Sequence, residues 1–298
     1  MTEQKIPSLE HVVRTFHEIF PPQLSESWDA SGLITGRLKQ PVRSIGLAVD
    51  ATVAVAQEAV QRKADVLITH HPLLLRPVHF IADDTYKGEV LQTLIEGQCA
   101  LLGAHTNVDS SPLGTNDVFM KLLGINEAKV LSDSQNINID GHEHSVGIGR
   151  VGELSEPVTL EELSCRIAHF LPATAGGLRV AGPKTAQVQK IALCTGAGDS
   201  LLGEVLKHEA DVYITADLRH HPASEFREGA SLSGGTPYLI DCSHYASESL
   251  WLKGAGELLQ QRLANQGYSI SFYVSELNTD PWDFVVSTGD VAGSASTF

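Results

Sequence analysis

The second half of the chain repeats part of the first half. Residues 45–52 (IGLAVDAT) align with residues 191–198 (IALCTGAG), an offset of 146 positions (191 minus 45). Residues 64–69 (ADVLIT) align without a gap at the same offset with residues 210–215 (ADVYIT), and five of these six positions are identical. A shared offset across both blocks predicts two related units, and any fold for this chain must contain both.

The first unit has the pattern of alternating strands and helices. Apolar runs of strand length alternate with segments of helical periodicity. The expected elements are a strand at 44–49, a helix at 53–63, a strand at 66–68, a helix at 89–96, a strand at 99–104 and a helix at 114–123. This order favours an α/β fold in which each of the two related units has a mostly parallel sheet.

The alternation stops after residue 124. We predict a first α/β unit at 1–124, a small middle insertion or subdomain at 125–187, a second α/β unit at 188–286 and a disordered tail at 287–298. Residues 142–144 (HEH) carry ligand-type side chains, but they fall in a polar stretch of the insertion, where solvated side chains are the expected interpretation.

Composition excludes several classes of protein. The formal charge of −15 opposes nucleic-acid binding, which depends on Lys and Arg, and means that a phosphate-bearing substrate would need a local cation. No apolar run approaches the roughly 20 residues of a membrane span, and the N-terminal residues do not resemble a signal peptide. The four cysteines lack CxxC spacing. We therefore expect a cytoplasmic protein without membrane contact.

Two adjacent histidines, His70 and His71, follow the buried strand of the ADVLIT block. Pro72 lacks a backbone N–H and favours extended geometry at His71, so both imidazoles are presented where the strand ends. Open α/β sheets bind their ligands at this end of the strands, and neutral imidazole is the commonest metal ligand. The pair therefore indicates a metal site, with a polar strand cap as the alternative.

Three further candidate ligands follow other strands. Asp109 comes shortly after the strand at 99–104, and His244 and Glu248 stand four residues apart at the start of a helix, on one face. Together with His70 and His71 they exceed the needs of one four-coordinate ion. We expect two divalent ions per chain that share a bridging carboxylate. Nitrogen and oxygen ligands without thiolate suit Zn, Mn, Fe or Co.

Other polar residues are candidates for supporting roles. His105 and Glu248 are the candidates for proton transfer, although a core position is equally compatible with His105. Asp50, Thr106 and His221 are candidates for orienting the ligands from behind, because metal-bound imidazoles usually donate their second N–H to a carboxylate or carbonyl.

Two loops leave alternatives open. Residues 26–33 (ESWDASGL) form either a packed corner or a loop that lines the site. The glycine-rich turn at 195–200 (TGAGDS) is interpreted as a tight turn, with an anion-binding loop as the alternative, and it lacks the lysine of a P-loop.

Several segments, in order, resemble the signature segments of the NIF-three-like family, also called GTP cyclohydrolase 1 type 2 homologues. These segments are WDASGL at 28–33, ITHHPLLL at 68–75, GAHTNVDS at 103–110, YITADLRHH at 213–221, DCSHYASE at 241–248 and TDPW at 279–282. The resemblance runs from about residue 8 to residue 283, and Ser243 departs from it by standing where the family usually has glycine.

The resemblance implies a fold, a metal site and an assembly. Members bind two divalent metals between two related α/β lobes and form a toroidal homohexamer. The family's metal ligands fall on His70, His71, Asp109, His244 and Glu248 of this chain.

Two functions follow as hypotheses. The first is a dinuclear metal-dependent hydrolase of a nucleotide-like or heterocyclic phosphate compound, with an unknown small-molecule substrate. The second is a non-catalytic metal-binding scaffold whose ring mediates partner contacts. An exchangeable coordination position would favour the first, and a closed ligand shell would favour the second.

Overall fold

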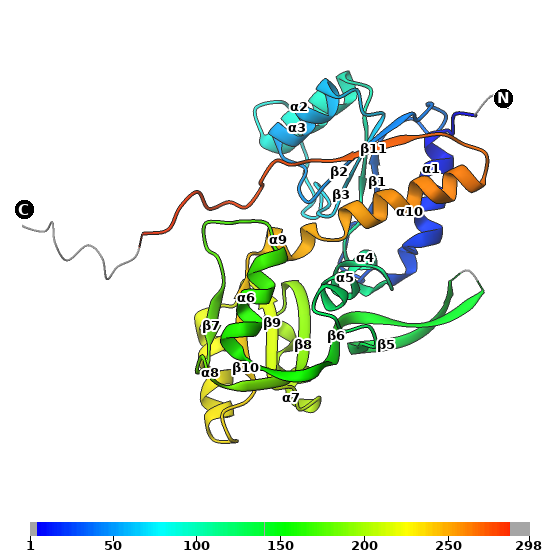
Figure 1. The fold of residues 1–298 in the computed structure, drawn as a ribbon. Helices are drawn as coiled ribbons and strands as arrows, with labels where there is room; N and C mark the ends of the chain where they lie inside the picture. Colours follow the sequence, from blue (N-terminus) through cyan, green and yellow to red (C-terminus); the bar gives the residue numbers. More distant parts are fainter. Residues whose placement is uncertain (1–4, 140, 287–298) are drawn as a thin grey trace, which may run out of the picture.

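The chain folds into two α/β units that lie side by side, each built on its own sheet (Figure 1). The computed structural model describes residues 5–139 and 141–286, so the tail predicted at 287–298 lies outside the described residues. The prediction of an α/β fold with two related units and parallel strands at the centre of each sheet is confirmed. Among the described residues, no helix is long and apolar enough to cross a membrane.

The first sheet has the strand order β1-β4-β3-β2-β11. Its strands are β1 (Gly32–Thr35), β2 (Ser44–Ala48), β3 (Val66–Thr69), β4 (Ala100–Gly103) and β11 (Ser271–Val274). The neighbours from β4 to β11 pair in parallel, whereas β1 pairs antiparallel with β4. Every residue of β3 and β4 is buried, as expected for parallel strands that helices cover on both faces.

The second sheet has the strand order β5-β6-β8-β9-β10-β7. Its strands are β5 (Lys129–Ile139), β6 (His142–Thr159), β7 (Arg179–Ala181), β8 (Gln187–Ala197), β9 (Val212–Ala216) and β10 (Tyr238–Cys242). β8, β9 and β10 run parallel, and antiparallel strands flank them on both sides. Each unit therefore contains three parallel strands that follow one another along the chain, β2 to β4 in the first and β8 to β10 in the second.

Helices cover both faces of each sheet. On the first sheet, α1 (Leu9–Ile19) and α10 (Leu252–Asn265) pack on one face, and α2 (Val53–Gln61) and α3 (Tyr86–Glu96) pack on the other. On the second sheet, one face is covered by α5 (Thr115–Leu122) and α6 (Leu160–Phe170) and the other by α7 (Leu202–Lys207) and α8 (His220–Ser231). The remaining helices are α4 (Thr106–Ser110) and α9 (His244–Ser249), with short 3-10 turns η1 (Pro22–Leu24) and η2 (Asp199–Leu201).

The chain returns to the first unit after α9. We assigned residues 188–286 to the second unit, but α10 and β11 belong to the first sheet and its core. The buried face of α10 contributes Leu252, Leu259 and Leu263 to the core cluster that also contains Phe16 of α1. α10 and β11 join the first unit because their apolar side chains are buried in its core, although they follow the second unit along the chain. The segment that passes from α9 to α10 thus connects the two units.

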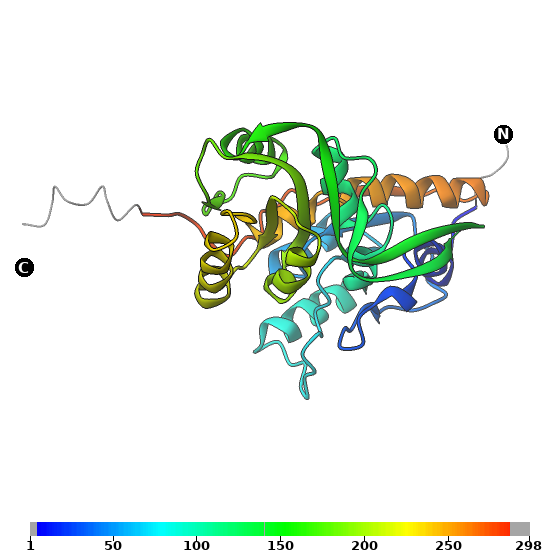
Figure 2. The same ribbon diagram turned by 90° about the horizontal axis from the view of Figure 1, so that it is seen from below.

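The middle segment extends the second sheet. Residues 125–187 supply the hairpin β5–β6, the helix α6 and the edge strand β7, all of which pair with or cover the second sheet (Figure 2). Thr159 caps α6, because its Oγ1 accepts the N–H of Glu162 at 3.1 Å. Residues 142–144 do not lie in a loop; they begin β6 and pair with β5, far along the hairpin from the parallel strands.

The repeat extends to individual hydrogen bonds. Asp65 Oδ2 accepts two backbone N–H groups, and Asp211 Oδ2 accepts two that are shifted by the same 146 positions (211 minus 65). The donors are Arg43 and Ser44 (2.6 and 3.0 Å) in the first unit and Gln189 and Lys190 (both 2.8 Å) in the second. The aspartate of the repeated ADV block thus fixes the start of one strand against its neighbour in both units.

Replacing either aspartate should destabilise the fold. Asp65→Ala and Asp211→Ala each leave two strand-end N–H groups without their acceptor, and we expect each to lower the free energy of unfolding by about 1–2 kcal/mol. The Asn variants keep one acceptor oxygen and should lose less. Urea denaturation followed by circular dichroism measures both, and an unchanged midpoint for both Ala variants would show that these bonds do not contribute.

Candidate metal centre

The carboxyl ends of the parallel strands from both sheets meet between the two units (Figure 1). The residues at these ends are Asp50 after β2, His70 and His71 after β3, Asp109 on α4 after β4, Gly196 near the end of β8, Asp217 after β9, and His244 and Glu248 on α9 after β10. The five predicted ligands therefore come together, although 178 positions separate the first from the last (248 minus 70).

The two adjacent histidines are held by the continuation of the sheet. The N–H of His70 donates to Ala48 O at 3.1 Å and that of His71 donates to Val49 O at 2.9 Å, so the β2–β3 pairing continues past the end of β3. His70 is fully buried and packs 5.9 Å from the ring of Trp251. The backbone, rather than a flexible loop, fixes where both imidazoles lie.

Asp109 is held by a buried network that reaches into the middle segment. Thr115 Oγ1 donates to Asp109 Oδ1 at 2.7 Å. The guanidinium of Arg150, on β6, is buried and donates to the carbonyl oxygens of Ser110 and Ser111 at 3.3 and 3.4 Å. A charged group from the middle segment thus fixes the turn that directly follows this ligand.

α9 supplies the other two ligands on one face. Ser243 Oγ accepts the N–H of Ala246 at 3.2 Å and caps the helix. His244 and Glu248 are four residues apart, so their side chains lie on the same side, and their Nε2 and Oε2 atoms are 3.2 Å apart. Serine caps the helix in the position where the family usually has glycine, so the departure at Ser243 leaves both ligands in place.

The two oxygens of Glu248 face two different sets of donors. Oε2 lies 2.9 Å from His71 Nε2 and 3.2 Å from His244 Nε2, and these two nitrogens are 3.2 Å apart. Oε1 lies 3.3 Å from His70 Nε2, which is 3.6 Å from Asp109 Oδ1. We call the first set the His71 triangle and the second the His70 triangle. Ligand atoms bound at roughly 2.0–2.2 Å to one ion are about 3–3.5 Å apart, so the His71 triangle has the spacing of a cation site. The His70 triangle is slightly wider, with its three ligand atoms within 4.8 Å of one another.

The burial of these atoms also fits a cation. Glu248 is 3% exposed, and neither ring nitrogen of His70 has a hydrogen-bond partner among the described residues. Burial opposes ionisation of Glu248, but His70, His244 and His71 outweigh it and hold the pKa of that carboxyl well below its usual value. An ionised carboxylate and unpaired imidazole nitrogens buried together are the donor set of a divalent transition metal.

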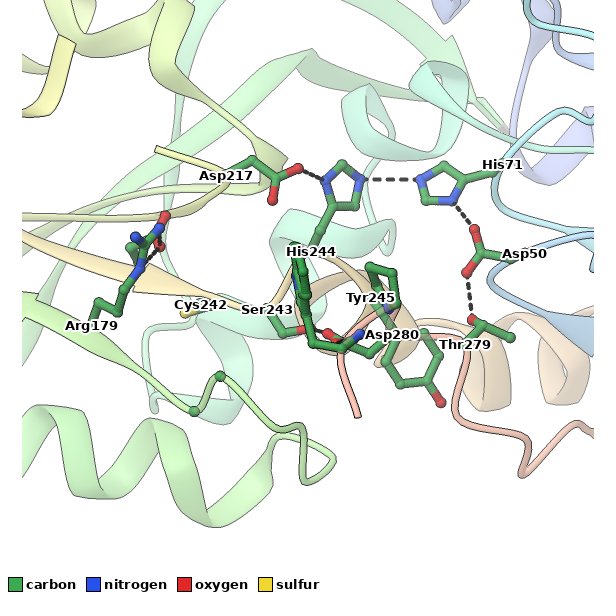
Figure 3. A pocket seen from close by; sticks show the side chains of 15 residues that line it. Asp50, His71, Arg179, Asp217, Cys242, Ser243, His244, Tyr245, Thr279 and Asp280 are labelled. Carbon is green, nitrogen blue, oxygen red and sulfur yellow. Dashed lines mark hydrogen bonds and ion pairs between the residues drawn. The ribbon is translucent and has the colours of Figure 1, made fainter. Parts of the chain in front are cut away.

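Carboxylates bind the Nδ1 atoms of His71 and His244, the two partly exposed histidines among the candidate ligands. His71 Nδ1 lies 2.7 Å from Asp50 Oδ1, as predicted, and His244 Nδ1 lies 2.7 Å from Asp217 Oδ2 (Figure 3). This is the usual orienting contact of a metal-bound histidine. Asp217 is not among the candidates that the sequence indicates, although the repeat contains the signal: position 217 is the counterpart of His71 (217 minus 146).

His105 lies beside the ligands and is oriented by a buried carboxylate. One ring nitrogen of His105 lies within 4.8 Å of one ring nitrogen each of His70 and His71. Its Nδ1 is 2.8 Å from Asp29 Oδ1, and the side chain of Asp29 has no exposed surface. Asp29, which sequence analysis did not single out, also accepts the N–H and Oγ1–H of Thr106.

The remaining sequence candidates are placed differently. Thr106 fixes Asp29 rather than a ligand. His221 is exposed on α8 with its ring edge-on to that of His220, and no hydrogen bond or ion pair joins it to the ligands among the described residues. The WDASGL loop lines the site, because the ring of Trp28 lies 5.8 Å from that of His105.

Gly196 leaves the space that Glu248 occupies. Its φ of +69° favours glycine, and a Cβ at this position would lie 2.2 Å from Glu248 Oε1. Position 196 is the repeat counterpart of Asp50 (196 minus 146), so the second unit lacks a side chain where the first carries a carboxylate. The repeat thus duplicates the scaffold and not the chemistry.

Metal affinity should rise with pH. Burial disfavours the imidazolium, but Glu248 and Asp50 raise the pKa of His71 to about 10, and Glu248 and Asp217 raise that of His244 to about 11. Below these values both rings hold protons that a metal must displace, so the dissociation constant should fall by up to about tenfold per displaced proton for each pH unit. Chelator competition between pH 6 and 8 measures this. An affinity that does not change with pH would contradict it.

Gly196→Ala should remove the metal from a folded protein. The added methyl group displaces the carboxylate that both triangles share, so we expect most of the bound metal to be lost, with a stability loss of about 1–2 kcal/mol from the positive φ. Gly203→Ala is the matched control, because a Cβ at position 203 in α7 would meet nothing within 4 Å. Elemental analysis and thermal melts compare the two. Full metal occupancy in Gly196→Ala would refute the placement of Glu248.

Comparisons with known proteins agree with the fold and the motifs. The family model of DUF34/NIF3 (NGG1p interacting factor 3) matches residues 7–281. A GTP cyclohydrolase 1 type 2 homolog from Streptomyces coelicolor is 38% identical over 97% of this chain and 98% of its own length. One from Clostridium perfringens is 32% identical, covering 93% of this chain and 99% of its own.

A solved structure shares the fold. The crystal structure of a Bacillus cereus protein related to NIF3 has a TM-score of 0.83 to this structure and 24% sequence identity, covering 94% of this chain and 100% of that chain. By its sequence match over nearly the whole chain, this protein belongs to the DUF34/NIF3 family.

Proposed function

We propose that this protein is a dinuclear divalent-metal-dependent hydrolase. The observation that supports it is the single buried carboxylate of Glu248, whose two oxygens face the His70 triangle and the His71 triangle. A carboxylate shared by two cation positions is typical of hydrolytic two-metal centres. The substrate class is a nucleotide-like or heterocyclic phosphate compound, in keeping with the name of the relatives, GTP cyclohydrolase 1 type 2 homolog.

Each triangle would hold one ion. His70, Asp109 and Glu248 would hold the first, and His71, His244 and Glu248 the second. Two divalent ions would supply Lewis-acid chemistry, polarising a substrate oxygen and activating water. The ligands are imidazoles and carboxylates, which suits Zn, Mn, Fe or Co.

His105 is the residue we assign to proton transfer. Both oxygens of Glu248 face ligand atoms, so Glu248 serves as a bridge and is not available as a proton carrier. Burial opposes ionisation of Asp29, but hydrogen bonds from His105 and Thr106 lower the pKa of its carboxyl well below its usual value. An ionised Asp29 on Nδ1 directs the other nitrogen of His105 to the site, where it can hold or move a proton.

Assembly and location complete the proposal. We assign a homohexamer on the resemblance to the family alone, and a stable monomer in light scattering would contradict it. The four cysteines are unpaired and three of them are buried, which supports the cytoplasm as the location.

Substitutions of the candidate ligands should lower the number of bound ions by different amounts. We expect wild-type protein reconstituted with Zn, Mn, Fe or Co to hold about two ions per chain. Asp109→Ala and His244→Ala each break one triangle and should keep about one ion, whereas Glu248→Gln breaks both and should keep almost none. Elemental analysis after gel filtration measures this. A wild-type content that stays near zero, or equal losses in all three variants, would contradict the assignment.

Activity is tested with the same proteins. GTP is the first substrate, and its hydrolysis should disappear with chelator and return with a divalent ion. His105→Ala should keep its metal and lose about 10²–10⁴-fold in kcat. Turnover that persists in metal-free protein would come from elsewhere, and the non-catalytic metal-binding scaffold would then be the better account.

A further inference from the structure

Two cavities adjoin the ligands, and they differ in which side of the imidazoles they meet. The first, of about 380 Å³, is lined by the ligands Asp109, His244 and Glu248 and by His105. The second, of about 530 Å³, lies on the side of Asp50 and Asp217, which bind the outer Nδ1 atoms (Figure 3). A substrate that reaches the metal positions and the proton carrier together must therefore enter the first cavity, which we call the His105 cavity.

We propose that the His105 cavity binds an uncharged planar ring, such as a nucleobase or its nucleoside, and offers no recognition for a polyphosphate chain. The proposal rests on the proposed function, because it names the part of the substrate that the same site recognises. It narrows the substrate class to the heterocycle.

The walls of the cavity suit an aromatic ring. Trp28 is 60% exposed and stands edge-on to His105, and Leu75, Ile148 and Leu201 add apolar surface. A volume of about 380 Å³ falls within the range of small-molecule sites. An exposed indole beside apolar walls is the usual platform on which a nucleobase stacks.

Trp28 is held in place by the elements that hold His105. The N–H of Glu26 donates to Thr106 Oγ1 at 2.9 Å, and the N–H of Asp29 donates to Glu26 O at 3.0 Å. The turn at 26–29 is tied to α4 before the indole by Glu26 and after it by Asp29, which accepts the N–H and Oγ1–H of Thr106. The stacking surface and the proton carrier share one support, so a ring placed on Trp28 lies beside His105.

The cavity offers no cationic side chain to a phosphate chain. Its acidic side chains are the ligands Asp109 and Glu248, whose charge bound ions would offset, and Glu26 and Asp133; no Lys or Arg lines it in the part of the chain that the structure describes. Phosphate groups are bound in proteins by Arg, by Lys and by unpaired backbone N–H groups. The first two are missing from this lining.

Two backbone N–H groups of the glycine-rich segment at 195–200 are not available as the third kind of donor. The N–H of Thr195 donates to Asn116 Oδ1 at 2.9 Å, and the N–H of Gly196 donates to Ser247 Oγ at 3.0 Å. These two backbone donors are therefore already used within the protein. Residues 195–197 end β8 and residues 199–201 form η2, so the strand runs through the glycine-rich segment into a short 3-10 helix.

The second cavity offers no alternative for a phosphate chain. Its acidic lining residues are Asp50, Asp217, Asp241 and Asp280, and Arg179, the one Lys or Arg in its described lining, has Nε donating to Asp241 at 2.7 Å (Figure 3). A triphosphate would meet carboxylates in either cavity, in a chain whose formal charge is −15. Phosphate oxygens would have only the metal ions as partners, in competition with the heterocycle.

Calorimetric titration of the metal-loaded full chain tests the proposal, with guanosine, GTP and inorganic tripolyphosphate as probes at matched free metal. We expect guanosine to bind at least as tightly as GTP. Trp28→Ala should weaken guanosine binding at least tenfold without loss of metal, and Trp28→Phe should restore most of it. Trp282→Ala is the matched control, because Trp282 is also exposed but lines the second cavity.

Three outcomes would overturn the proposal. In the first, GTP binds at least tenfold more tightly than guanosine and tripolyphosphate competes with GTP for the site. In the second, Trp28→Ala leaves guanosine binding unchanged, and in the third guanosine does not bind at all. Turnover tests the proposed function separately from ring binding. Guanosine that binds in a Trp28-dependent way without turnover of any nucleoside or nucleotide would support the ring site and argue against the hydrolase.

Discussion

The structure depends on one buried carboxylate. Glu248 is 3% exposed, and its two oxygens face different imidazoles, so its charge must be compensated from both sides. A buried ionised carboxylate is stable only with partners of opposite charge or strong donors. The surrounding features serve this arrangement: the missing side chain at Gly196 leaves room for the carboxylate, and Asp50 and Asp217 orient the imidazoles that face it.

The internal repeat explains how distant residues reach this carboxylate. Each unit directs the carboxyl ends of three parallel strands to the space between the sheets, which is where α/β folds bind ligands. The meeting of the five candidate ligands was predictable because each follows a strongly apolar strand or lies at the start of a helix after one. The pairing of His70 with His71 was the strongest signal, since Pro72 fixes the backbone after them.

The rest could not be predicted, because it depends on tertiary packing. Nothing local shows that α10 and β11 return to the first sheet, since their apolar periodicity fits either core. Asp29 lies 76 positions from His105 (105 minus 29), and only the fold brings it there. The sequence makes His221 a candidate for orienting the ligands, yet it is exposed on α8. Residues that support a site from a distance leave weaker patterns than residues that end strands.

Anomalous X-ray diffraction from crystals of the zinc-reconstituted protein tests the central claim most directly. The account predicts two anomalous peaks about 3.5–4 Å apart. One should lie among His70, Asp109 and Glu248 and the other among His71, His244 and Glu248, each within bonding distance of a different Glu248 oxygen. A single peak, or two peaks of which neither contacts Glu248, would contradict it.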